Sequence, residues 1–297
     1  MLILVTGGSG FVGREIVRQF VAAGDRVRVL SRGAAPAGDG VERIRGSVLE
    51  PASVAAAVSG VDAVVHLVGI ISEVGSQTFE RVHVDGTEVV VSATRAAGVR
   101  RYVHMSALGT RREARSRYHR SKWEAEELVR KSGLDWTILR PSLIYGPGDG
   151  FINLFARMSR VSPCIPVVGP GTNLMQPVDV GDVARCFCRA PSLRESVHQT
   201  LDLCGRERFN VNEILSMVLE VLGRRRILVH LPWGLAGLQA RALETIYPRL
   251  LGKASPLNRE QILMLQEDNV GDPEPACRMF ALEPVRFREG IRRFLSA

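Results

Sequence analysis

The chain has 297 residues, of which 45% are hydrophobic and 24% are charged, so it is long enough to bury a large core and too apolar for a disordered protein. Its formal net charge is +8, but only three of its 39 basic residues are lysines. The arginines are spread along the chain, which permits anionic partners such as phosphates or acidic lipids. No zinc-finger or RNA-binding motif occurs, so the sequence argues against nucleic acid as the main partner.

The five cysteines form no CxxC pair, and the six histidines form no HxH or HxxxH pair. Neither a disulfide framework nor a metal site is therefore expected, and a reducing compartment fits best. The opening MLILVTGG is typical of a strand rather than a signal peptide, and no run of about 18 apolar residues occurs. We expect a cytoplasmic protein without a transmembrane segment, with a peripheral position on the inner face of a membrane as the alternative.

Residues 1–145 alternate short apolar runs with longer amphipathic stretches, which predicts βαβ units on a parallel sheet. Glycines follow the amphipathic stretches, at positions where a helix C-cap favours them. The expected strands are 2–5, 26–30, 41–45, 62–68, 101–105 and 135–139, and the expected helices are 11–23, 51–58, 77–97 and 117–131. The pattern predicts an α/β fold with a Rossmann-type doubly wound parallel sheet as the dinucleotide-binding domain.

From residue 146 onwards, glycine- and proline-rich loops separate shorter elements, with helices expected at 151–160, 181–190 and 210–223. We interpret 146–297 as a smaller, interleaved substrate or partner lobe with a helical tail. Residues 227–252 form an amphipathic stretch that either packs on the core or lies on a membrane surface or a partner subunit. The three arginines at 224–226 are either a solvated helix end or an addition to a contact with acidic lipids.

The segment TGGSGFVG (6–13) follows the first expected strand and opens the first expected helix. Its spacing of Gly7, Gly10 and Gly13 allows a tight turn, so that backbone N–H groups approach a pyrophosphate at the positive end of the helix. We therefore assign this loop to cofactor binding, including its remaining members Ser9, Phe11 and Val12.

The second expected strand ends in Ser31 and Arg32, and no carboxylate follows until Asp39. A Rossmann unit for NAD(H) carries an acidic residue here, whereas a basic residue accommodates the 2′-phosphate of NADP(H). Arginine can bind a phosphate through two hydrogen bonds. The sequence therefore favours NADP(H) over NAD(H), with a simple solvated loop arginine as the alternative.

Tyr118 and Lys122 lie four residues apart on an expected helix, which places both side chains on one face. This helix follows the fifth strand, whose carboxyl end faces the cofactor crevice. A phenol there can exchange a proton with a substrate if its pKa falls toward the working pH, and a neighbouring ammonium would favour that. Ser106, just after the strand, could polarise the substrate oxygen. The alternative is a half-buried aromatic residue beside a solvated lysine.

Together these motifs resemble the extended short-chain dehydrogenase/reductase superfamily through about residue 205. The other stretches that carry the resemblance are RGSVLEP (45–51), DAVVHLVG (62–69), VDGT (84–87), TILRPSLIYGPGD (137–149) and QPVDVGDVA (176–184). The resemblance implies that Lys122 reaches the nicotinamide ribose. It also implies that the adenine is flanked by Ser47 and Val48, that the nucleotide lies over Leu67, Val68 and Gly69, and that the nicotinamide end is lined by Pro141, Leu143 and Ile144.

A narrower resemblance includes the tail PLNREQILMLQEDNV (256–270). It is to the subgroup that contains the NAD(P)H-binding accessory subunit of respiratory complex I and its bacterial relatives, whose mitochondrial members are regarded as structural. Three positions depart from the extended-enzyme pattern. Ser47 replaces an aspartate, His83 replaces an asparagine that makes a structural hydrogen bond, and Ala107 stands where a second serine is usual.

Three functions remain open at this point, and with them the question of enzymatic activity. The first is an NADP(H)-binding protein of the complex I accessory-subunit type, linked to the respiratory chain or to quinone metabolism, with respiratory subunits or a membrane surface as partners. The second is a soluble NADP-dependent oxidoreductase, epimerase or dehydratase that acts on a carbonyl or hydroxyl group through Tyr118 and Lys122. The third is a non-catalytic NADP(H) redox sensor, which Ala107 would suit.

Overall fold

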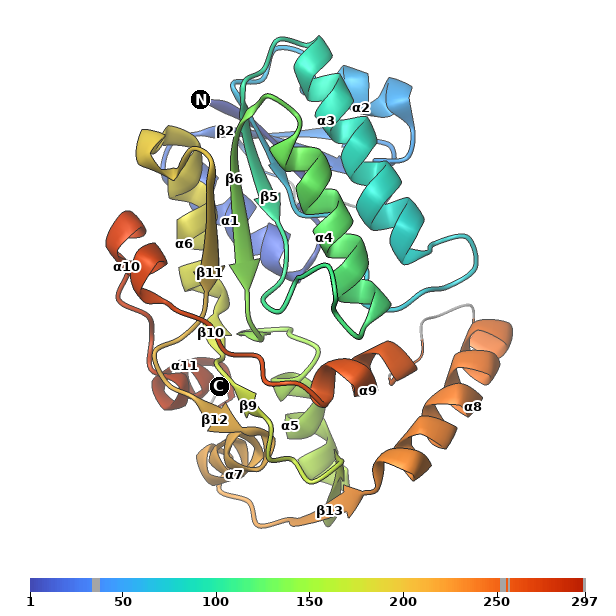
Figure 1. The fold of residues 1–297 in the computed structure, drawn as a ribbon. Coiled ribbons are helices and arrows are strands. Elements are labelled where there is room, and N and C mark those ends of the chain that lie inside the picture. Colours follow the sequence, from blue (N-terminus) through green and yellow to red (C-terminus); the bar gives the residue numbers. More distant parts are fainter. Residues whose placement is uncertain (34–37, 252–254, 256, 296–297) are drawn as a thin grey trace.

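The centre of the molecule is a parallel sheet of seven strands (Figure 1). The computed structural model describes residues 1–33, 38–251, 255 and 257–295. The strands follow the order β11-β6-β5-β4-β1-β2-β3, and every neighbouring pair is parallel. Their bounds are β1 Leu2–Thr6, β2 Arg26–Ser31, β3 Val41–Arg45, β4 Ala63–His66, β5 Arg101–Met105, β6 Asp135–Pro141 and β11 Gln199–Leu203. All six expected strands occur, and the predicted doubly wound α/β fold is confirmed; β11 was not predicted.

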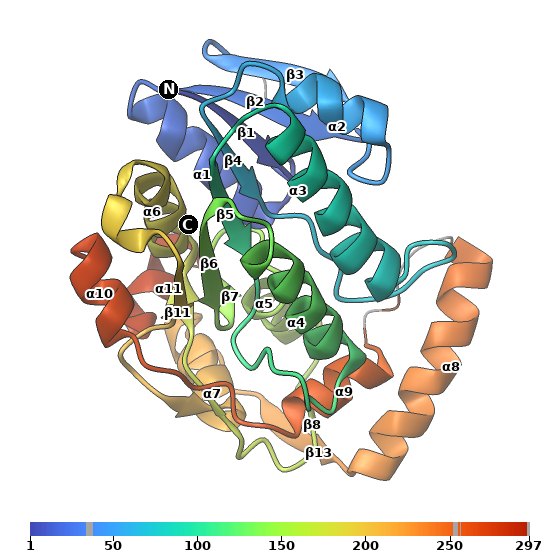
Figure 2. The ribbon, with the colours of Figure 1, turned by 45° about the horizontal axis from the view of Figure 1, so that its top comes forward.

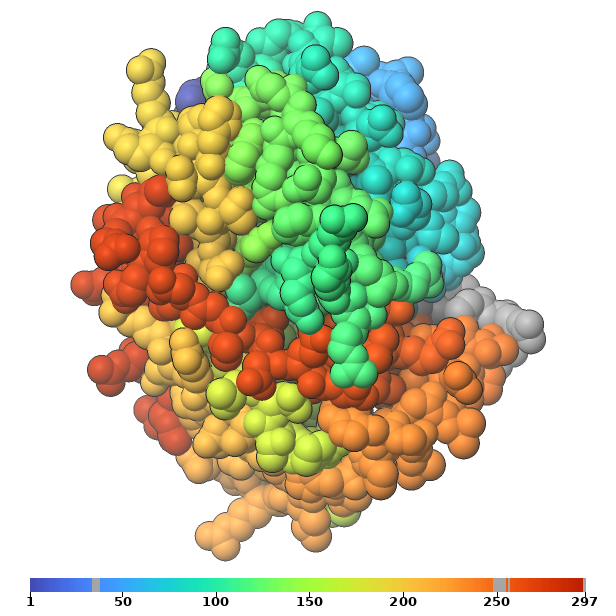
Figure 3. All heavy atoms as spheres, in the orientation of Figure 1, coloured from blue at the N-terminus to red at the C-terminus, as the bar shows by residue number. Residues whose placement is uncertain are grey.

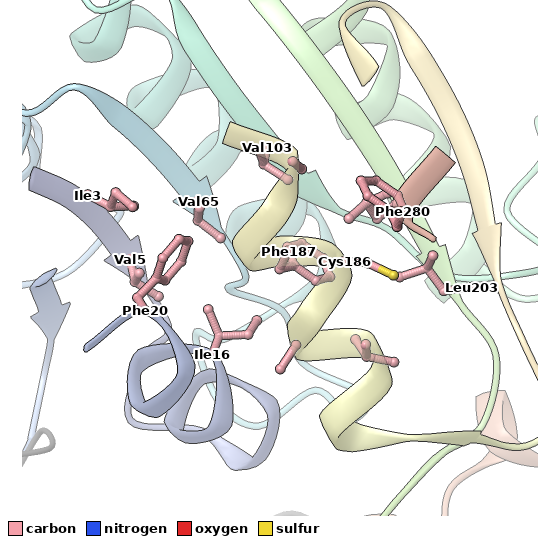
Figure 4. Close-up of a cluster of buried hydrophobic side chains, with 14 of the residues drawn as sticks. Ile3, Val5, Ile16, Phe20, Val65, Val103, Cys186, Phe187, Leu203 and Phe280 are labelled. Atoms are coloured by element: carbon pink, nitrogen blue, oxygen red, sulfur yellow. The ribbon is translucent and has the colours of Figure 1, made fainter. Parts of the chain in front are cut away.

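Helices cover both faces of this sheet, as parallel strands require. One face carries α1 (Phe11–Ala22), α6 (Val180–Arg189) and α10 (Glu274–Phe280), and the other carries α2 (Pro51–Val58), α3 (Gly86–Ala96) and α4 (Arg117–Arg130). Figure 4 shows Phe20 of α1 and Phe187 of α6 in the apolar layer against the sheet residues Val5 and Val65. Because α6, α10 and β11 come from beyond residue 146, the C-terminal part of the chain is interleaved with the sheet. The division at residue 145 itself stays a prediction.

One expected helix, 77–97, has two parts. A π-helical turn, η1 (Glu80–Asp85), runs directly into α3 without a break. The turn carries His83, whose side chain is 1% exposed and lies against the loop that follows β4. Single π turns are often found at functional sites, and this one brings a polar side chain to the edge of the sheet where a cofactor would bind.

The smaller lobe lies beyond the carboxyl ends of the strands. Its core contains Tyr145, Ile165, Ile214, Leu215 and Phe287, all 2% exposed or less. Its helices are α5 (Ile152–Val161), α7 (Val211–Val221) and α11 (Phe287–Leu295), with the single-turn η2 (Ala190–Ser192) and η3 (Arg194–Ser196) beside the sheet. Its strands form three short pairs: β7 (Ile144–Tyr145) with β10 (Val178–Asp179), β9 (Leu174–Met175) with β12 (Phe209–Asn210), and β8 (Cys164–Val168) with β13 (Ile227–Leu231).

Two helices form the outer edge of this lobe. The long helix α8 (Trp233–Leu251) packs through Ala236 and Ala240 against Ile262 of the short helix α9 (Arg259–Leu265). In two views α9 lies between α4 and α8, so α8 is the outermost element on that side (Figures 1 and 2). None of the described helices combines the length and the apolar character needed to cross a bilayer.

Candidate functional site

A cavity of about 390 Å³ opens where the strand order reverses, between the carboxyl ends of β1 and β4. The last residues of these strands, Thr6 and His66, are register partners. Open α/β sheets bind their ligands at such a switch point. The cavity is lined by the loops that follow the first four strands of the chain. Among the predicted cofactor residues, its lining includes Gly7, Ser9, Gly10, Phe11, Val12, Gly13, Ser31, Arg32, Ser47, Val48, Leu67, Val68 and Gly69.

The backbone of the glycine loop follows a path that leaves space for an anion. Gly7 has a φ of +77°, and a Cβ on Gly13 would lie only 2.2 Å from the Gly7 oxygen. The loop closes through a 3.0 Å hydrogen bond from the Gly10 N–H to that oxygen. Gly10 caps α1 without a side-chain hydrogen bond, so the first N–H groups of the helix face the cavity unblocked. These groups and the helix dipole fit a pyrophosphate.

The end of β2, where the sequence predicts the adenosine, forms one wall of the cavity. Ser31 Oγ donates to the Gly33 oxygen at 2.8 Å, and Arg32 Nη1 donates to Gln77 Oε1 at 3.1 Å. Arg32 and Gln77 both line the cavity. The described residues that line this cavity include no carboxylate and no lysine. Arg32 is the one charged residue among them.

The loop after β4 is held in place by His83. Its Nε2 accepts a hydrogen bond from the Ile70 N–H at 3.0 Å, so the ring proton is on Nδ1, which lies 2.8 Å from Ser121 Oγ. Burial lowers the pKa of His83 to about 2, which keeps the ring neutral. A histidine therefore makes a loop-holding hydrogen bond at the position where the resemblance implies an asparagine, and the floor of the cavity at Leu67, Val68 and Gly69 is fixed.

Lys122, which the sequence predicts to reach the nicotinamide ribose, lies beside the cavity but is not among the residues that line it. The side chain is 3% exposed, and Nζ donates to the Met105 oxygen at 3.0 Å. A Cβ on Gly69 would lie 3.0 Å from Nζ, so the amine packs closely against this glycine. Met105 and Gly69 both line the cavity. Burial lowers the pKa of Lys122 to about 8, with Glu126 opposing the shift. An amine in this place can donate hydrogen bonds to a ribose.

Tyr118 lies one turn earlier on α4, but its surroundings differ. The half-buried ring makes edge contacts with Phe79, His83 and His119, with centroids 5.9, 5.5 and 5.2 Å apart. Burial raises the pKa of Tyr118 to about 12, which is opposite to the shift that proton exchange at neutral pH requires. Tyr118 is not among the residues that line the cavity.

The remaining predicted site residues also lie outside the lining of this cavity. Ser106 is 2% exposed, and its Oγ donates to Thr110 Oγ1 at 3.3 Å. Pro141 ends β6 and accepts a hydrogen bond from the Leu108 N–H at 2.9 Å. Leu143 and Ile144 pack against the apolar clusters at the junction with the smaller lobe. The structure thus brings the predicted residues that follow β1, β2, β3 and β4 together around one cavity, whereas the hydroxyl of Ser106 is paired with that of Thr110.

A C-terminal strap, residues 257–271, was missed as a site element. Asn258 Nδ2 donates to the Ile71 oxygen, Asn269 Nδ2 donates to the Leu108 oxygen, and the Gly271 N–H donates to Gln176 Oε1, at distances of 2.9, 3.2 and 3.0 Å. The strap therefore crosses the loops after β4 and β5 and reaches the smaller lobe. Figure 3 shows residues 266–273, which join α9 to α10, running across the face of the molecule.

Two strand histidines, His66 and His104, are part of the core. His66 and His104 are at most 1% exposed, and the His66 ring bonds to Thr6 Oγ1 at 2.7 Å. Burial lowers the pKa of His66 to about 3 and holds the pKa of His104 well below its usual range, so both rings are neutral. In the part of the chain that the structure describes, no cluster of His, Cys, Asp or Glu could hold a metal ion.

Known proteins are similar to this chain in sequence and in fold. Residues 7–154 match a family described as NAD(P)H-binding. Ceramide reductase of Caulobacter vibrioides is 32% identical over 240 residues, which cover 78% of this chain and 74% of that protein. This chain belongs to the NAD(P)-binding short-chain dehydrogenase/reductase and epimerase superfamily. The cofactor of the cavity is accordingly an NAD(P) dinucleotide, as the glycine loop predicted.

Other members of the superfamily differ in function. The 2-alkyl-3-oxoalkanoate reductase of Stenotrophomonas maltophilia is 30% identical over 328 residues, covering 99% of this chain and 98% of that protein. Subunit 9 of the alpha subcomplex of mitochondrial NADH dehydrogenase (ubiquinone) from Arabidopsis thaliana is 28% identical over 278 residues, covering 89% and 68%. The predicted likeness to this complex I subunit is therefore confirmed. The dTDP-glucose 4,6-dehydratase of Streptomyces venezuelae, solved with NAD, shares the fold at a TM-score of 0.77 and 23% identity over 100% of this chain and 96% of the other.

Proposed function

We propose that this protein holds NADP(H) as a bound ligand, in a role of the complex I accessory-subunit type linked to the respiratory chain or to quinone metabolism. The observation that carries the proposal is the contrast between the two members of the Tyr118–Lys122 pair. Lys122 presents its amine between two cavity-lining residues, whereas Tyr118 packs among aromatic rings with a raised pKa. The similarity to the Arabidopsis subunit over 89% of the chain supports the same role.

The preference for NADP(H) over NAD(H) rests on Arg32. Its guanidinium lines the adenosine end of the cavity and donates to the neutral amide of Gln77. A 2′-phosphate would replace that neutral acceptor with a charged one, which a guanidinium can bind through two parallel hydrogen bonds. NAD(H) would instead meet a cationic side chain with no carboxylate to bind its 2′-hydroxyl.

Calorimetric titration of NADPH and NADH tests this preference. Arg32→Ala is expected to weaken NADPH binding by about tenfold to a hundredfold and to leave NADH binding nearly unchanged. Arg18→Ala is the matched control, because Arg18 is an exposed arginine that pairs with Glu15 on α1 and does not line the cavity. An equal loss for both nucleotides in Arg32→Ala would contradict the 2′-phosphate assignment.

A respiratory role is tested on the protein in its native cells. Affinity capture of the full chain is expected to bring down subunits of the respiratory NADH dehydrogenase in stoichiometric amounts. The Arg32→Ala variant is expected to capture less of them if nucleotide occupancy stabilises the docked form. Recovery of the protein as a lone band, from cells that contain the respiratory enzyme, would contradict the accessory-subunit role without affecting the NADP(H) assignment.

A second candidate is an NADPH-dependent reductase of a lipid-like ketone. The specific support is that Tyr118 and Lys122 lie one turn apart beside the cofactor crevice, together with the likeness to ceramide reductase and 2-alkyl-3-oxoalkanoate reductase. The cofactor supplies a hydride to the carbonyl carbon, and Tyr118 would donate its hydroxyl proton to the carbonyl oxygen. The ketone is reduced to an alcohol and NADPH is oxidised to NADP⁺.

NADPH oxidation measured with long-chain 2-alkyl-3-oxo acids separates the two candidates. A reductase shows ketone-dependent oxidation that Tyr118→Phe abolishes while the Kd for NADPH is unchanged. Turnover that survives Tyr118→Phe contradicts the assignment of this tyrosine. Tight NADPH binding without oxidation by these ketones contradicts the reductase and supports the holding role.

A further inference from the structure

The exposed large apolar side chains of this protein are not scattered. Eight occur among the residues whose side chains the structure describes, and six of them lie on one region of the smaller lobe. We name this region the β13–α8 surface. It consists of Val161 at the end of α5, Ile227 and Val229 on β13, and Leu235, Leu238 and Ile246 on α8. The Arg226 Nε donates to the Ser159 oxygen at 2.9 Å, which places the end of α5 beside β13.

Helix α8 turns one side to the protein and another to solvent. Ala236 and Ala240 are fully buried against α9, whereas Leu235, Leu238 and Ile246 are 55%, 65% and 49% exposed. These three residues share one stripe, because their spacings of three and eight residues return to the same side of a helix. Single exposed leucines need no explanation, but a continuous apolar stripe on an outermost helix indicates a contact surface.

Positive charge surrounds the apolar stripe. Between residues 224 and 247 the chain has four arginines, at 224, 225, 226 and 241, and a single acidic residue, Glu244. The Glu244 carboxylate is already paired with Arg259 Nε at 2.8 Å. Arg157 and Arg160, on the exposed side of α5, add to the same side of the lobe. The combination of aliphatic side chains with unbalanced arginines is the composition of a helix that lies on an anionic bilayer.

We propose that the β13–α8 surface docks this protein on a membrane that contains anionic lipids. Helix α8 lies in the plane of the interface, with Leu235, Leu238 and Ile246 at the level of the upper acyl chains and Arg225 and Arg241 at the lipid phosphates. The position of α8 at the outer edge of the molecule allows a flat surface to reach it (Figures 1 and 2). A second copy of the chain is a poorer partner, since it would bring the same arginines face to face.

The docked orientation also points the cofactor crevice toward the lipids. Helix α8 is joined to α9 by the Glu244–Arg259 ion pair, and Asn258, which caps α9, donates to the Ile71 oxygen. Ile71 is itself 49% exposed and follows Ile70, which lines the cavity. Membrane docking would therefore place the loop after β4, which borders the cavity through Ile70, near the bilayer. The proposal does not depend on whether Tyr118 is active.

Vesicle flotation of the full-length protein tests the proposal. The wild type is expected to float with phosphatidylcholine vesicles that contain phosphatidylglycerol and to remain at the bottom with pure phosphatidylcholine. The double variant Leu238→Ser/Ile246→Ser is expected to lose affinity by at least about tenfold, because two apolar side chains no longer enter the lipid. Arg225→Gln/Arg241→Gln is expected to lose about fivefold per arginine, with a smaller loss at high salt.

Two controls keep the result interpretable. Arg95→Gln removes one charge from an exposed position at the end of α3, on the sheet side of the molecule, and is expected to float like the wild type. The Kd for NADPH is expected to be unchanged in every variant, which shows that the fold is intact.

Equal binding to neutral and anionic vesicles, or flotation of Leu238→Ser/Ile246→Ser like the wild type, would overturn the proposal. A dimer in sedimentation that Leu238→Ser/Ile246→Ser converts to a monomer would likewise assign the surface to a second copy.

Discussion

The amine of Lys122 donates a hydrogen bond to the backbone oxygen of Met105 at 3.0 Å, which ties helix α4 to the end of β5 beside the cofactor cavity. The same amine lies against Gly69 on the other side. The fold thus positions the Lys122 amine without a ligand, so the ribose of the proposed cofactor would meet a donor that is already fixed.

Removing this amine should weaken nucleotide binding. Lys122→Ala is expected to raise the Kd for NADPH and for NADH alike, by about tenfold or more, because a ribose hydrogen bond is lost from both cofactors. Titration calorimetry with both nucleotides checks this. The equal effect distinguishes Lys122 from Arg32, for which the loss should fall on NADPH. An unchanged Kd in Lys122→Ala would place the nicotinamide ribose elsewhere.

The buried amine should also give stability a defined pH dependence. Burial lowers the pKa of Lys122 from its ordinary value of 10.5 to about 8, so below pH 8 the folded state carries a buried ammonium. Between these two values the folded state releases its proton first. The unfolded state then binds more protons, and the contribution of Lys122 to the free energy of unfolding becomes more favourable as pH rises.

The measurement is the difference in free energy of unfolding between Lys122→Met and the wild type. Lys122→Met is expected to exceed the wild type in stability by the largest margin below pH 8. This margin should shrink as the pH approaches 10.5. Taking the difference cancels the contribution of the buried cysteines to the pH dependence, because burial raises their pKa values in both proteins. A difference that stays constant across this window would mean that the amine is not buried in solution.

The parts of the site that the sequence could predict are local ones. The glycine loop and the Tyr118–Lys122 spacing each lie within one strand–turn–helix unit or one helix turn, so periodicity is enough to place them. Arg32 meets Gln77 across 45 positions, and Asn269 meets Leu108 across 161. Such pairs depend on how loops that are distant in the sequence pack together, which a local sequence pattern cannot predict.

The chemistry of a predicted residue was harder to anticipate than its position. The helix phase places Tyr118 and Lys122 on one face, but it does not say that Phe79 and His83 surround the phenol. His83 belongs to η1, and Phe79 is the residue before it. Burial among these neighbours raises the pKa of Tyr118, whereas the ammonium of Lys122 was expected to lower it. A side chain's pKa depends on neighbours from other elements, which the order of residues does not give.

A buried carboxylate joins α4 to the sheet. Glu126 is 0% exposed and accepts from Arg130 and from both Nε and Nη2 of Arg140 on β6. Glu126→Gln would remove the hydrogen-bonded counter-charge of the partly buried Arg140 guanidinium, so we expect the free energy of unfolding to fall by about 3 kcal/mol. Urea denaturation checks this. Glu127→Gln is the control, because that partly exposed ion pair should contribute at most about 1 kcal/mol. Equal losses would show that burial of Glu126 carries no special cost.

Gly13 is the position in the cofactor loop that tolerates a side chain least. A Cβ there would lie 2.2 Å from the Gly7 oxygen and 2.7 Å from Gly8 Cα, so Gly13→Ala must push α1 away from the loop. We expect a loss of about 3 kcal/mol in the free energy of unfolding, with loss of measurable NADPH binding. Gly237→Ala on α8, with nothing within 4 Å of its Cβ, should stabilise by up to about 1 kcal/mol. Normal NADPH binding by Gly13→Ala would contradict the assignment of this loop.

His83 should be replaceable by the residue that the superfamily pattern has in its place. Its Nε2 accepts from the Ile70 N–H, and its Nδ1 side meets Ser121, in a site where the ring is 1% exposed. His83→Ala leaves a buried N–H unpaired and a cavity behind, so we expect a loss of about 3 kcal/mol in stability and weaker NADPH binding. His83→Asn retains an acceptor and should lose distinctly less on both measurements.

The comparison of these two variants isolates the hydrogen bond from the packing. Asparagine and alanine are both smaller than histidine, but only asparagine can accept from the Ile70 N–H, which holds the cavity floor at Gly69. His230→Ala, at an exposed histidine on β13, serves as the control and should change stability by less than about 1 kcal/mol. If His83→Asn loses as much NADPH affinity as His83→Ala, ring volume rather than the hydrogen bond fixes the loop, and the pairing with Ile70 is incidental to cofactor binding.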